Sequence, residues 1–555
     1  MRGVIPGGAR IKAVVKRLRR RLQVDPTTKA FARHNRKVWA LDGQGGPRPR
    51  GVILVDFHDM QPVWVAKSYL LPLLASRHEA RVLSHSIAGR EPFGVPDSNA
   101  SLGRVLRSMG VKEHHRVSFE AAAVLAAEEQ SRTFIRKANS RSDLLALTVR
   151  EVNVGLDVYE SYLRRFGAAT VDLDDPRLVE VLALALLLLE HWEGFFRTEE
   201  VKAVVSSHDT YVEMNTLVRL AMREGVPVYV PRPNHLHRPV EPISYGSSFP
   251  RYPALFEALP RAVQEAGVEL ARTELQARLA GADGGLVYME NLAFRQGGDA
   301  EGGVGRERVL AQDGKPCVVL FTHCFSDAPH VWGGMLFSDF VEWIQFVAQV
   351  AGETDFHWYL KPHPACEEAS RPHLEAMGVL APHGPLELIP GRITHHQLLD
   401  EGMTVALTAY GTIGHELPLM GVPVLNAGYN PHVGYDFNFT PESREEYREL
   451  LLRIPELREG WSVDPEDVYQ FYFMHNYRVF TDDLVYPSFR GLMRDVGGHG
   501  QTCSPLAYQA FLDSWSPERH QEIIRRMEAF LDSDAVFSWE VDDPSRLLPL
   551  LEQTV

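Results

Sequence analysis

One stretch, residues 356–431, limits what this 555-residue chain can fold into more than any other. Apolar segments at 356–360 and 403–407 predict strands, and each ends abruptly in polar residues. A helical pattern at 413–420 follows the second segment, and another apolar segment begins directly after it. Strand, loop, helix and strand in this order predict an α/β domain, in which ligands bind at the carboxyl ends of the strands.

A similar pattern lies in the first half of the chain. Residues 51–55 and 203–207 predict strands that end in polar loops, and the strand expected at 226–230 completes a second strand–loop–helix–strand unit. Length favours two domains as well, because single hydrophobic cores stop growing beyond about 250–300 residues. The sequence therefore predicts an α/β fold with two Rossmann-like domains that face each other across a cleft.

Polar and glycine-rich stretches mark the expected boundaries. The stretch 42–50 is a linker, and 296–307 is the expected interdomain connection. We expect four parts: a basic amphipathic tail and linker at 1–50, an N-terminal Rossmann-like domain with a helical insertion at 51–300, a C-terminal Rossmann-like domain at 308–500, and a helical segment at 501–555.

The N-terminal tail differs in charge from the rest of the chain. Residues 1–22 hold eight basic residues and no acidic one, whereas the whole chain carries a formal charge of −14. The helix that this segment predicts has one apolar face, formed by Ile11, Val14, Val15, Leu18 and Leu22. This composition is typical of a helix that lies on an anionic membrane surface. A basic tail without structure, or a helix docked on the acidic body, are the alternatives.

Composition excludes several other classes. The negative charge argues against a nucleic-acid-binding protein. The longest apolar run, 181–189, is nine residues, and a membrane span needs roughly twenty. The N-terminus has no signal-peptide pattern, so we expect a cytoplasmic protein, peripheral on the inner face of the plasma membrane. The four cysteines form no C-x-x-C pair and are expected to be reduced thiols without a metal: Cys317, Cys324, Cys366 and Cys503.

Polar side chains follow four of the predicted strands. They are Asp56, His58 and Asp59 after the first, then His208 and Asp209, His323 and Asp327, and finally Lys361 and His363. If two α/β domains face each other, these loops line one cleft. The alternative is that each histidine is a structural residue whose hydrogen bonds are satisfied locally.

His363 lies between two prolines, which stiffen the backbone around it. An imidazole held in this way can donate to a phosphate oxygen and offset the charge of a nucleotide leaving group, and Lys361 can add a positive charge. The alternative is that Lys-Pro-His-Pro only ends a strand.

Small and hydroxyl-bearing residues precede the helix expected at 413–420. Hydroxyls and free N–H groups at Thr408, Gly411 and Thr412 suit a phosphate. Glu416, one turn into the helix, can accept hydrogen bonds from ribose hydroxyls, although a surface glutamate that interacts only with the helix dipole is the alternative. We expect no metal and no cofactor at this site.

Taken in order, these motifs resemble the capsule and surface-polysaccharide biosynthesis glycosyltransferases of bacteria. The resemblance covers roughly residues 50–480 and rests on four stretches, which are 155–164, 205–211, 321–343 and 356–431. It implies the two-Rossmann GT-B architecture, with an N-terminal acceptor domain, a C-terminal domain that holds a nucleotide-sugar, and no obligatory metal. It also implies that His363 contacts the donor phosphate, assisted by Thr408 and Thr412. The chain departs from the family at Tyr410-Gly411-Thr412, where Ser-Ser or Ser-Thr is usual, and this leaves open which hydroxyl binds phosphate.

The resemblance thus predicts a glycosyltransferase that moves a sugar from a nucleotide-sugar to a growing glycan or lipid-linked acceptor. The base that deprotonates the acceptor is expected to be His208 or Asp59, with His58, Asp209 and His323 positioning substrates. The alternative for His208 is that it only forms a hydrogen bond within its loop. Three other functions stay open: a polyol-phosphate transferase of the teichoic-acid type, a nucleotide-sugar epimerase, and a non-catalytic polysaccharide-assembly protein.

Overall fold

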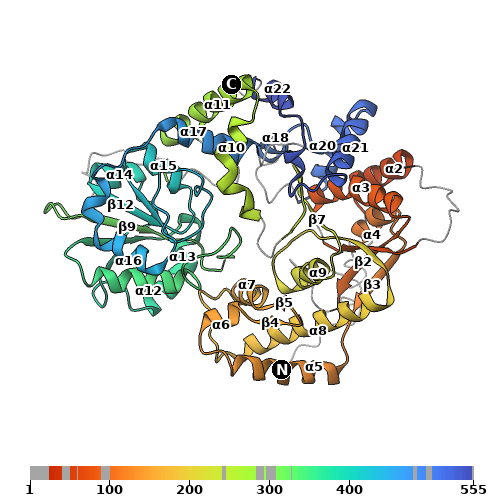
Figure 1. Cartoon of the computed structure of the whole chain (residues 1–555), viewed down its shortest axis with the longest axis horizontal. Coiled ribbons are helices and arrows are strands. Elements are labelled where there is room, and N and C mark those ends of the chain that lie inside the picture. The colour runs from red at the N-terminus through yellow and green to blue at the C-terminus, as the bar shows by residue number, and fades with distance from the viewer. Residues whose placement is uncertain are drawn as a thin grey trace, which may run out of the picture. The chain divides into compact units, whose positions relative to one another are not determined.

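The computed structural model describes residues 24–39, 50–58, 60–88, 100–240, 245–282, 293–294, 308–326, 328–478, 484–495 and 503–552. Backbone contacts divide the chain into two compact units. Unit 1 consists of Met1–Ala127, Leu184–Val240 and Asp483–Asp542, and unit 2 consists of Glu128–Ala183, Glu241–Asp482 and Asp543–Val555. Each unit contains its own parallel sheet, as Figure 1 shows.

Unit 1 is built on a sheet with the strand order β3-β2-β1-β6-β7-β8. The pairs are parallel except the last, in which β8 runs antiparallel to β7. The strands are β1 (Val52–Asp56), β2 (Arg81–Ile87), β3 (Glu113–Val117), β6 (Val201–Val205), β7 (Val228–Pro231) and β8 (Leu236–His237). Every residue of β1 is buried, because a central parallel strand is covered on both faces, and this is why it is a continuous apolar run.

Helices surround this sheet and tie the chain's distant parts to it. They are α2 (Pro26–Val38), α3 (Gln61–Arg77), α4 (Ala100–Arg107), α9 (Val212–Arg223), α18 (Phe489–Asp495), α20 (Leu506–Ser514) and α21 (Pro517–Leu531), with the 3-10 turn η6 (Ser538–Glu540). Phe31 of α2 stacks on Tyr508 of α20 with ring centroids 4.4 Å apart. The segment expected as a separate C-terminal helical part therefore packs, in large part, within unit 1.

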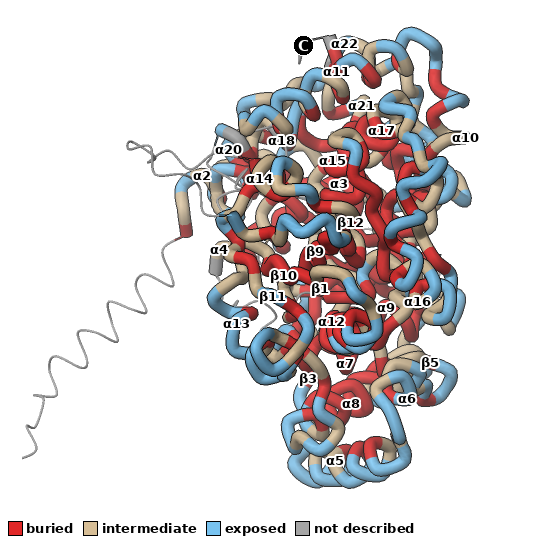
Figure 2. The backbone as a smooth tube through the Cα atoms, turned by 90° about the vertical axis from the view of Figure 1, so that its left-hand side faces the viewer, coloured by how far each residue is buried: buried red, intermediate tan, exposed pale blue. Residues whose placement is uncertain are grey.

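Unit 2 is built on an all-parallel sheet with the strand order β11-β10-β9-β12-β13. The strands are β9 (Cys317–Phe321), β10 (His357–Lys361), β11 (Leu386–Leu388), β12 (Met403–Thr408) and β13 (Val424–Asn426). The tube in Figure 2 shows β9 and β12 as buried. In chain order this sheet reads 3-2-1-4-5, as in a doubly wound nucleotide-binding half-domain.

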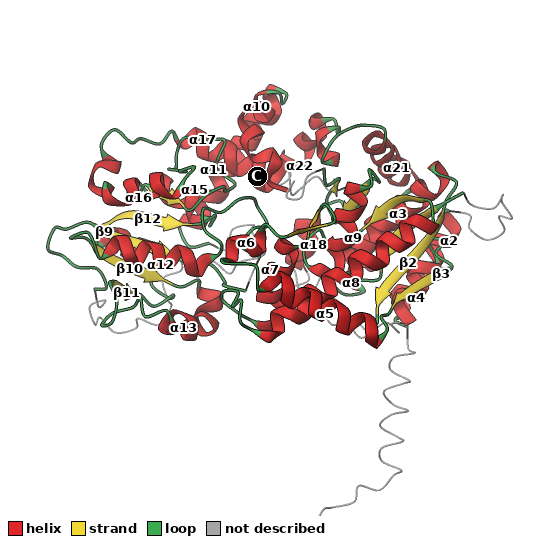
Figure 3. Cartoon of the chain, turned by 60° about the horizontal axis from the view of Figure 1, so that its bottom comes forward, coloured by secondary structure: helices red, strands yellow, loops and turns green. Residues whose placement is uncertain are grey.

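The helices of unit 2 lie on both faces of the sheet (Figures 1 and 3). Val318 and Leu320 of β9 pack with α12 (Phe340–Ala351) and α16 (Arg444–Leu452). Val319 and Phe321, which point to the opposite face, pack with α14 (His395–Asp400) and α15 (Ile413–Leu419). The remaining elements of unit 2 are the hairpin β4 (Thr148–Val149) and β5 (Val152–Asn153), helices α6 (Arg141–Leu145), α7 (Gly155–Phe166), α10 (Tyr252–Glu257), α11 (Arg261–Leu279), α13 (Glu367–Ala376), α17 (Pro465–Phe473) and α22 (Leu548–Glu552), the 3-10 turns η2 (Tyr245–Arg251), η3 (Pro364–Cys366), η4 (Ile454–Arg458) and η7 (Pro544–Leu547), and the π-helix η5 (Met474–Arg478).

The helical segment at 128–183 is held in unit 2 by buried polar contacts. The Tyr159 hydroxyl and the Thr170 hydroxyl each donate to Oδ2 of Asp339 at 2.5 Å. Glu160 lies 2.5 Å from Nδ1 of His330 and also accepts from the His330 backbone N–H at 3.2 Å. The 155–164 motif thus holds the loop and helix that follow β9.

The expected N-terminal domain, 51–300, includes residues 128–183 and 241–300. Backbone contacts instead group these residues with the second sheet, in unit 2. The division falls within α5 (Ala121–Ile135) and α8 (Pro176–Thr198). The interdomain connection expected at 296–307, and the basic helix expected at 1–22, lie outside the described residues.

The α/β class with two Rossmann-like parallel sheets is confirmed by the sheets themselves. The N-cap of α12 is Asp339, whose side chain accepts from the Glu342 N–H at 2.9 Å. The Ser338 N–H donates back to the Glu342 carboxylate at 2.6 Å, which completes a reciprocal cap. Among the described helices, none combines the length and apolar character that crossing a membrane requires.

Candidate functional site

The predicted site residues of unit 2 lie where its strand order reverses. The chain builds β9, β10 and β11 outward on one side and then returns to add β12 beside β9. His323 follows β9, and Thr408 is the last residue of β12. In open α/β sheets the loops at such a reversal splay apart and leave room for a ligand at the carboxyl edge.

His323 and Thr408 are joined at this edge. The Tyr410 N–H donates to Nε2 of His323 at 3.4 Å, which makes Nε2 an acceptor, so the Thr408 hydroxyl donates to the same nitrogen at 3.2 Å. The Gly411 N–H in turn donates to the Thr408 hydroxyl at 3.1 Å. Protein surrounds the imidazole, and this burial, with His363 nearby, lowers the pKa of His323 to about 3. His323 is therefore neutral at physiological pH and acts as an organiser of the loop.

The loop after β12 needs glycine at position 411. A Cβ there would lie 2.8 Å from the Thr408 hydroxyl oxygen and 3.5 Å from Cε1 of His323. Beyond it, the N–H groups of Thr412 and Ile413 meet no acceptor among the described residues, and the Thr412 side chain does not cap α15. The helix is only seven residues long, because Pro418 and Gly421 end it early. The hydroxyl of Thr408 is thus engaged within the protein, and a role of Thr412 in phosphate binding stays a prediction.

Lys361 is buried at the carboxyl end of β10, and its role is partly structural. Its ammonium donates to the Gly391 carbonyl at 2.9 Å, while the Gly391 N–H donates to Glu367 at 3.0 Å. Burial, opposed by the charge of Glu367, lowers the pKa of Lys361 to about 8. Lys361 thereby holds the Gly391 loop against the Pro362–His363 backbone and keeps a positive charge near it.

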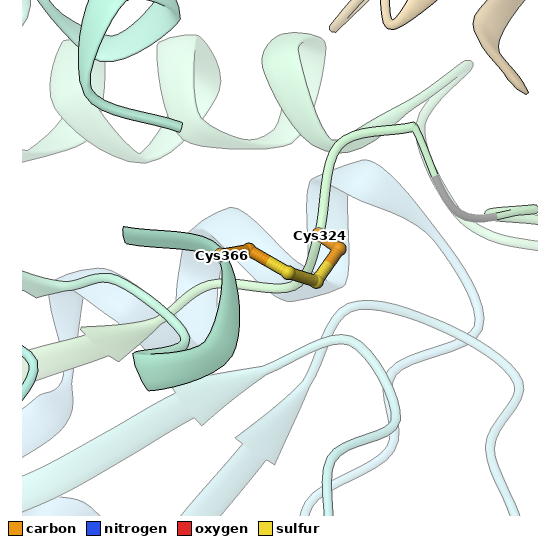
Figure 4. The surroundings of a disulfide bond; sticks show 2 residues. All are labelled: Cys324 and Cys366. Carbon is orange, nitrogen blue, oxygen red and sulfur yellow. A yellow bond between two sulfur atoms is a disulfide. The ribbon is translucent and has the colours of Figure 1, made fainter. Parts of the chain in front are cut away.

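His363 lies on the partly exposed loop between β10 and η3. Its carbonyl accepts from the Cys366 N–H at 2.9 Å. Cys366 forms a disulfide with Cys324, and the two Cα atoms are 5.7 Å apart (Figure 4). The expectation of reduced thiols is wrong for this pair, because the loops after neighbouring strands β9 and β10 bring together residues 42 positions apart in sequence. Cys317 and Cys503 take part in no disulfide among the described residues.

Glu416 is fully buried, so the alternative of a surface glutamate is wrong. Its Oε1 pairs with Nε of Arg278 on α11 at 2.6 Å. Its second oxygen, Oε2, is buried and has no hydrogen-bond partner within the described part of the chain. Glu416 therefore holds α15 against α11 with one oxygen and presents an unsatisfied acceptor with the other.

In unit 1 the predicted residues also lie at a reversal of strand order, between β1 and β6. Asp56, at the end of β1, pairs with the ammonium of Lys67 at 2.5 Å and accepts from the Ser207 N–H at 3.0 Å. Lys67 also donates to the Ser207 hydroxyl at 2.7 Å. Burial alone would raise the pKa of Asp56, but Lys67 and His58 outweigh it and lower the pKa to about 2. Asp56 is a permanently charged residue that joins β1, α3 and the loop after β6.

Two histidines flank this ion pair. His58 is buried, and burial lowers its pKa against the opposing charge of Asp56. His208 keeps some exposed surface, yet burial of its ring and the charge of Arg232 lower its pKa to about 3. This pKa is far below the ordinary histidine value of 6.5. The ring is neutral at pH 7, which lets it accept a proton but makes it a weak base.

Asp209 lies beside His208 and has two cationic or polar neighbours. Its Oδ1 is 3.3 Å from Nη2 of Arg232, and its Oδ2 is 3.4 Å from Nδ1 of His237. Although burial alone would raise the pKa of Asp209, His237 and Arg232 hold it below its ordinary value. Two residues later Tyr211 has φ 69° and ψ 145°, a conformation that is costly for a residue with a Cβ. Such strain at the start of α9 is typical of a loop whose shape serves a site.

Asp59 and Asp327 lie outside the described residues, so their roles stay predictions. Sequence reasoning missed two buried cations that organise the site, Lys67 and Arg278. For Lys67 a signal existed, because it interrupts an otherwise apolar helix, Val63 to Leu71, and a charge in such a position requires a buried partner. Arg278 lies 138 residues from Glu416, and the two other arginines of its helix, Arg261 and Arg272, form surface pairs with nearby glutamates.

Comparisons with known proteins add little to this geometry. No protein-family model matches the chain, and no curated protein does. Solved structures match over most of the chain at low identity. They include a glycotransferase of kitacinnamycin (14% identity, 77% of this chain and 94% of that one, TM-score 0.21), a UDP-GlcNAc 2-epimerase of Methanocaldococcus jannaschii (10%, 77% and 99%, 0.21) and a wall teichoic acid polymerase variant (11%, 90% and 95%, 0.20). TM-scores this low establish no common arrangement. The chain is an α/β protein with two parallel sheets, each of which carries polar loops at the carboxyl edge where its strand order reverses.

Proposed function

We propose that the chain is a metal-independent, GT-B-type glycosyltransferase. It moves a sugar from a nucleotide-sugar to a surface or capsular polysaccharide, or to a lipid-linked acceptor. The observation that carries the proposal is the carboxyl edge of the unit 2 sheet, where β9 and β12 separate. His323, Thr408 and the available N–H groups of Thr412 and Ile413 gather at this reversal, the position at which such sheets bind nucleotides.

In this proposal unit 2 holds the donor. The N–H groups of Thr412 and Ile413 and the Thr412 hydroxyl bind the phosphates, while Gly411 allows the loop to approach closely. His363 donates a hydrogen bond to the phosphate oxygen that gains charge when the bond to the sugar's anomeric carbon breaks. Lys361 adds positive charge behind this loop, and Asp327 is a further candidate donor-binding residue.

The unsatisfied Oε2 of Glu416 fits the ribose of a nucleotide. A buried carboxylate oxygen without a partner carries a desolvation cost of about 1–3 kcal/mol. A ribose hydroxyl that donates to Oε2 would recover part of this cost on binding. The contact would therefore favour nucleotides over ligands that carry phosphate alone.

Unit 1 supplies the acceptor side. The acceptor hydroxyl attacks the anomeric carbon, and its proton passes to a base, for which His208 and Asp59 are the candidates. His58 and Asp209 position the acceptor. The Asp56–Lys67 pair holds the two loops in place and takes no proton itself, since the pKa of Asp56 is about 2.

Residues 1–22 would hold the enzyme at the cytoplasmic face of the plasma membrane. Their basic side chains attract anionic lipid at roughly 1 kcal/mol per residue near the surface. This location suits a lipid-linked or growing polysaccharide acceptor.

A two-stage experiment tests the proposal. Thermal unfolding with CMP, UDP, GDP and CDP first identifies the nucleotide, because a ligand bound only by the native state raises Tm. The corresponding nucleotide-sugars and nucleotide-polyols are then incubated with the protein and acceptor glycans. Sugar transfer supports the proposal. Polyol-phosphate transfer would instead indicate a polyol-phosphate transferase, and conversion of the sugar without transfer would indicate an epimerase. Binding without turnover would indicate a non-catalytic assembly protein.

A further inference from the structure

Three metal-binding side chains meet at the carboxyl edge of β9 and β10. They are the sulfurs of Cys324 and Cys366 and a ring nitrogen of His363, and these donor atoms all lie within 4.8 Å of one another. All three residues are partly exposed, so an ion from solvent can reach them. Figure 4 shows the two cysteines on separate loops that converge here, joined through their sulfurs.

We propose that, once this disulfide is reduced, Cys324, Cys366 and His363 form a binding site for a thiophilic divalent cation such as Zn²⁺. Zinc bound tetrahedrally, with about 2.3 Å to sulfur and about 2.0–2.1 Å to nitrogen, places its ligands roughly 3.5–3.8 Å apart. In the disulfide the two sulfurs are bonded to each other, and all three donor atoms lie within 4.8 Å of one another. After reduction the sulfurs need only move apart to the zinc spacing, which side-chain rotation allows.

The ligand set matches the chemistry of zinc. Two thiolates and one imidazole are a known three-residue set for zinc, with the fourth position left to water or to a ligand. His363 and Cys366 are three residues apart on a loop whose backbone is fixed by Pro362, Pro364 and the hydrogen bond from the Cys366 N–H to the His363 carbonyl. Cys324 reaches the same point from the neighbouring strand end.

The disulfide and the metal site exclude each other. A thiol is a metal ligand as the thiolate, and a sulfur bonded to another sulfur has no such charge. Reduction of the disulfide by a dithiol or phosphine reductant adds two electrons and two protons, and zinc binding then releases the thiol protons.

This inference rests on the proposed function in one respect. His363 is the proposed donor to the leaving phosphate, and zinc would occupy one of its ring nitrogens. The reduced, zinc-bound protein should then transfer sugar more slowly than the reduced, zinc-free protein. Zinc would therefore inhibit an enzyme whose chemistry needs no metal.

Cobalt binding tests the site without reference to activity. Co²⁺ is titrated into the reduced full-length protein, and the thiolate-to-cobalt charge-transfer band is followed by absorbance, with Zn²⁺ then added to displace it. We expect one cobalt per chain, lost in Cys324→Ser/Cys366→Ser and in the oxidised protein, and retained in the matched control Cys317→Ser/Cys503→Ser. His363→Ala should keep a thiolate band but bind more weakly and with altered ligand-field bands.

The absence of a band in the reduced wild type, or its persistence in Cys324→Ser/Cys366→Ser, would overturn the metal site. Circular dichroism checks that each variant is folded. If Cys324→Ser/Cys366→Ser does not fold, the weaker binding expected of His363→Ala still tests the site. If cobalt binds but zinc leaves sugar transfer unchanged, the metal site stands and the proposed role of His363 fails.

Discussion

The pair formed by Arg278 and Glu416 should be a main determinant of the stability of unit 2. The two side chains are 3% and 1% exposed, and Nε lies 2.6 Å from Oε1. Replacing Arg278 by methionine keeps the volume of the side chain but leaves a buried carboxylate without its cation. Removing one partner of a buried pair typically costs about 3–5 kcal/mol, so we expect Arg278→Met to destabilise unit 2 by that amount.

Two further variants separate the charge from the packing. Arg278→Met/Glu416→Met removes both charges, including the carboxylate whose Oε2 is unsatisfied in the native pair. The free energy of unfolding of this double variant should therefore lie within about 1 kcal/mol of the wild-type value or above it. Arg272→Met is the matched control on the same helix. Arg272 lies 3.0 Å from Glu269 on the surface, and exposed pairs contribute less than about 1 kcal/mol.

Native-state hydrogen exchange is the appropriate assay, because a chain with two units does not unfold in one step. Peptides from β12 and α15 report on unit 2, and peptides from β1 are the internal reference. If Arg278→Met lowers the exchange protection of the unit 2 peptides no more than Arg272→Met does, the Arg278–Glu416 pair is not a main determinant of stability. A double variant that is as unstable as the single one would refute the assignment of this cost to the unpaired charge.

Three other expectations follow from the structure. Burial lowers the pKa of Lys67, so its charge is costly, but the pKa of Asp56, about 2, also lies below its ordinary value of 3.8. The ionised carboxylate of Asp56 therefore contributes about 2 kcal/mol to the stability of unit 1 above pH ~4. This is lost as pH falls through ~2, and β1 exchange should show the loss in the wild type but not in Asp56→Asn/Lys67→Met; an equal loss in both would contradict it. His208→Gln should lower kcat/KM at least about 10²-fold. Because the pKa of His208 is about 3, the wild-type pH profile of kcat/KM should show no acidic limb from this residue between about pH 5 and 8. An acidic limb near pH 6.5 that His208→Gln removes would contradict the lowered pKa. Deleting residues 1–22 should release the protein from anionic vesicles without changing turnover of soluble substrates, whereas unchanged co-sedimentation would speak against a membrane role.

Local patterns predicted central strands of both sheets, whereas the edge strands β3, β8 and β11 were not predicted. The apolar run before Lys361 and the one before Thr408 become β10 and β12, because buried parallel strands must be continuously apolar. The helix after Thr412 ends at Leu419, next to the expected limit of 420. The position of the candidate residues at strand ends follows from the same patterns.

Pairings between distant residues were not accessible in this way. Glu416 carries no sequence mark that distinguishes a buried ion pair from a surface charge, and its partner is 138 residues away. Cys324 and Cys366 are brought together only by the neighbouring positions of β9 and β10. The pKa of His208 depends on Arg232 and on burial by several elements, neither of which a single sequence specifies.

We propose above that His363 stabilises the departing phosphate of the donor at the carboxyl edge of the unit 2 sheet. The most direct measurement compares kcat for the identified nucleotide-sugar in His363→Ala and in His357→Ala. His357 is the first residue of β10, which ends just before His363, and its ring pairs with exposed Asp313 at 2.9 Å. We predict that His363→Ala remains folded and loses about 10²–10³ in kcat, while His357→Ala stays close to wild type. Near-normal turnover by folded His363→Ala would contradict it.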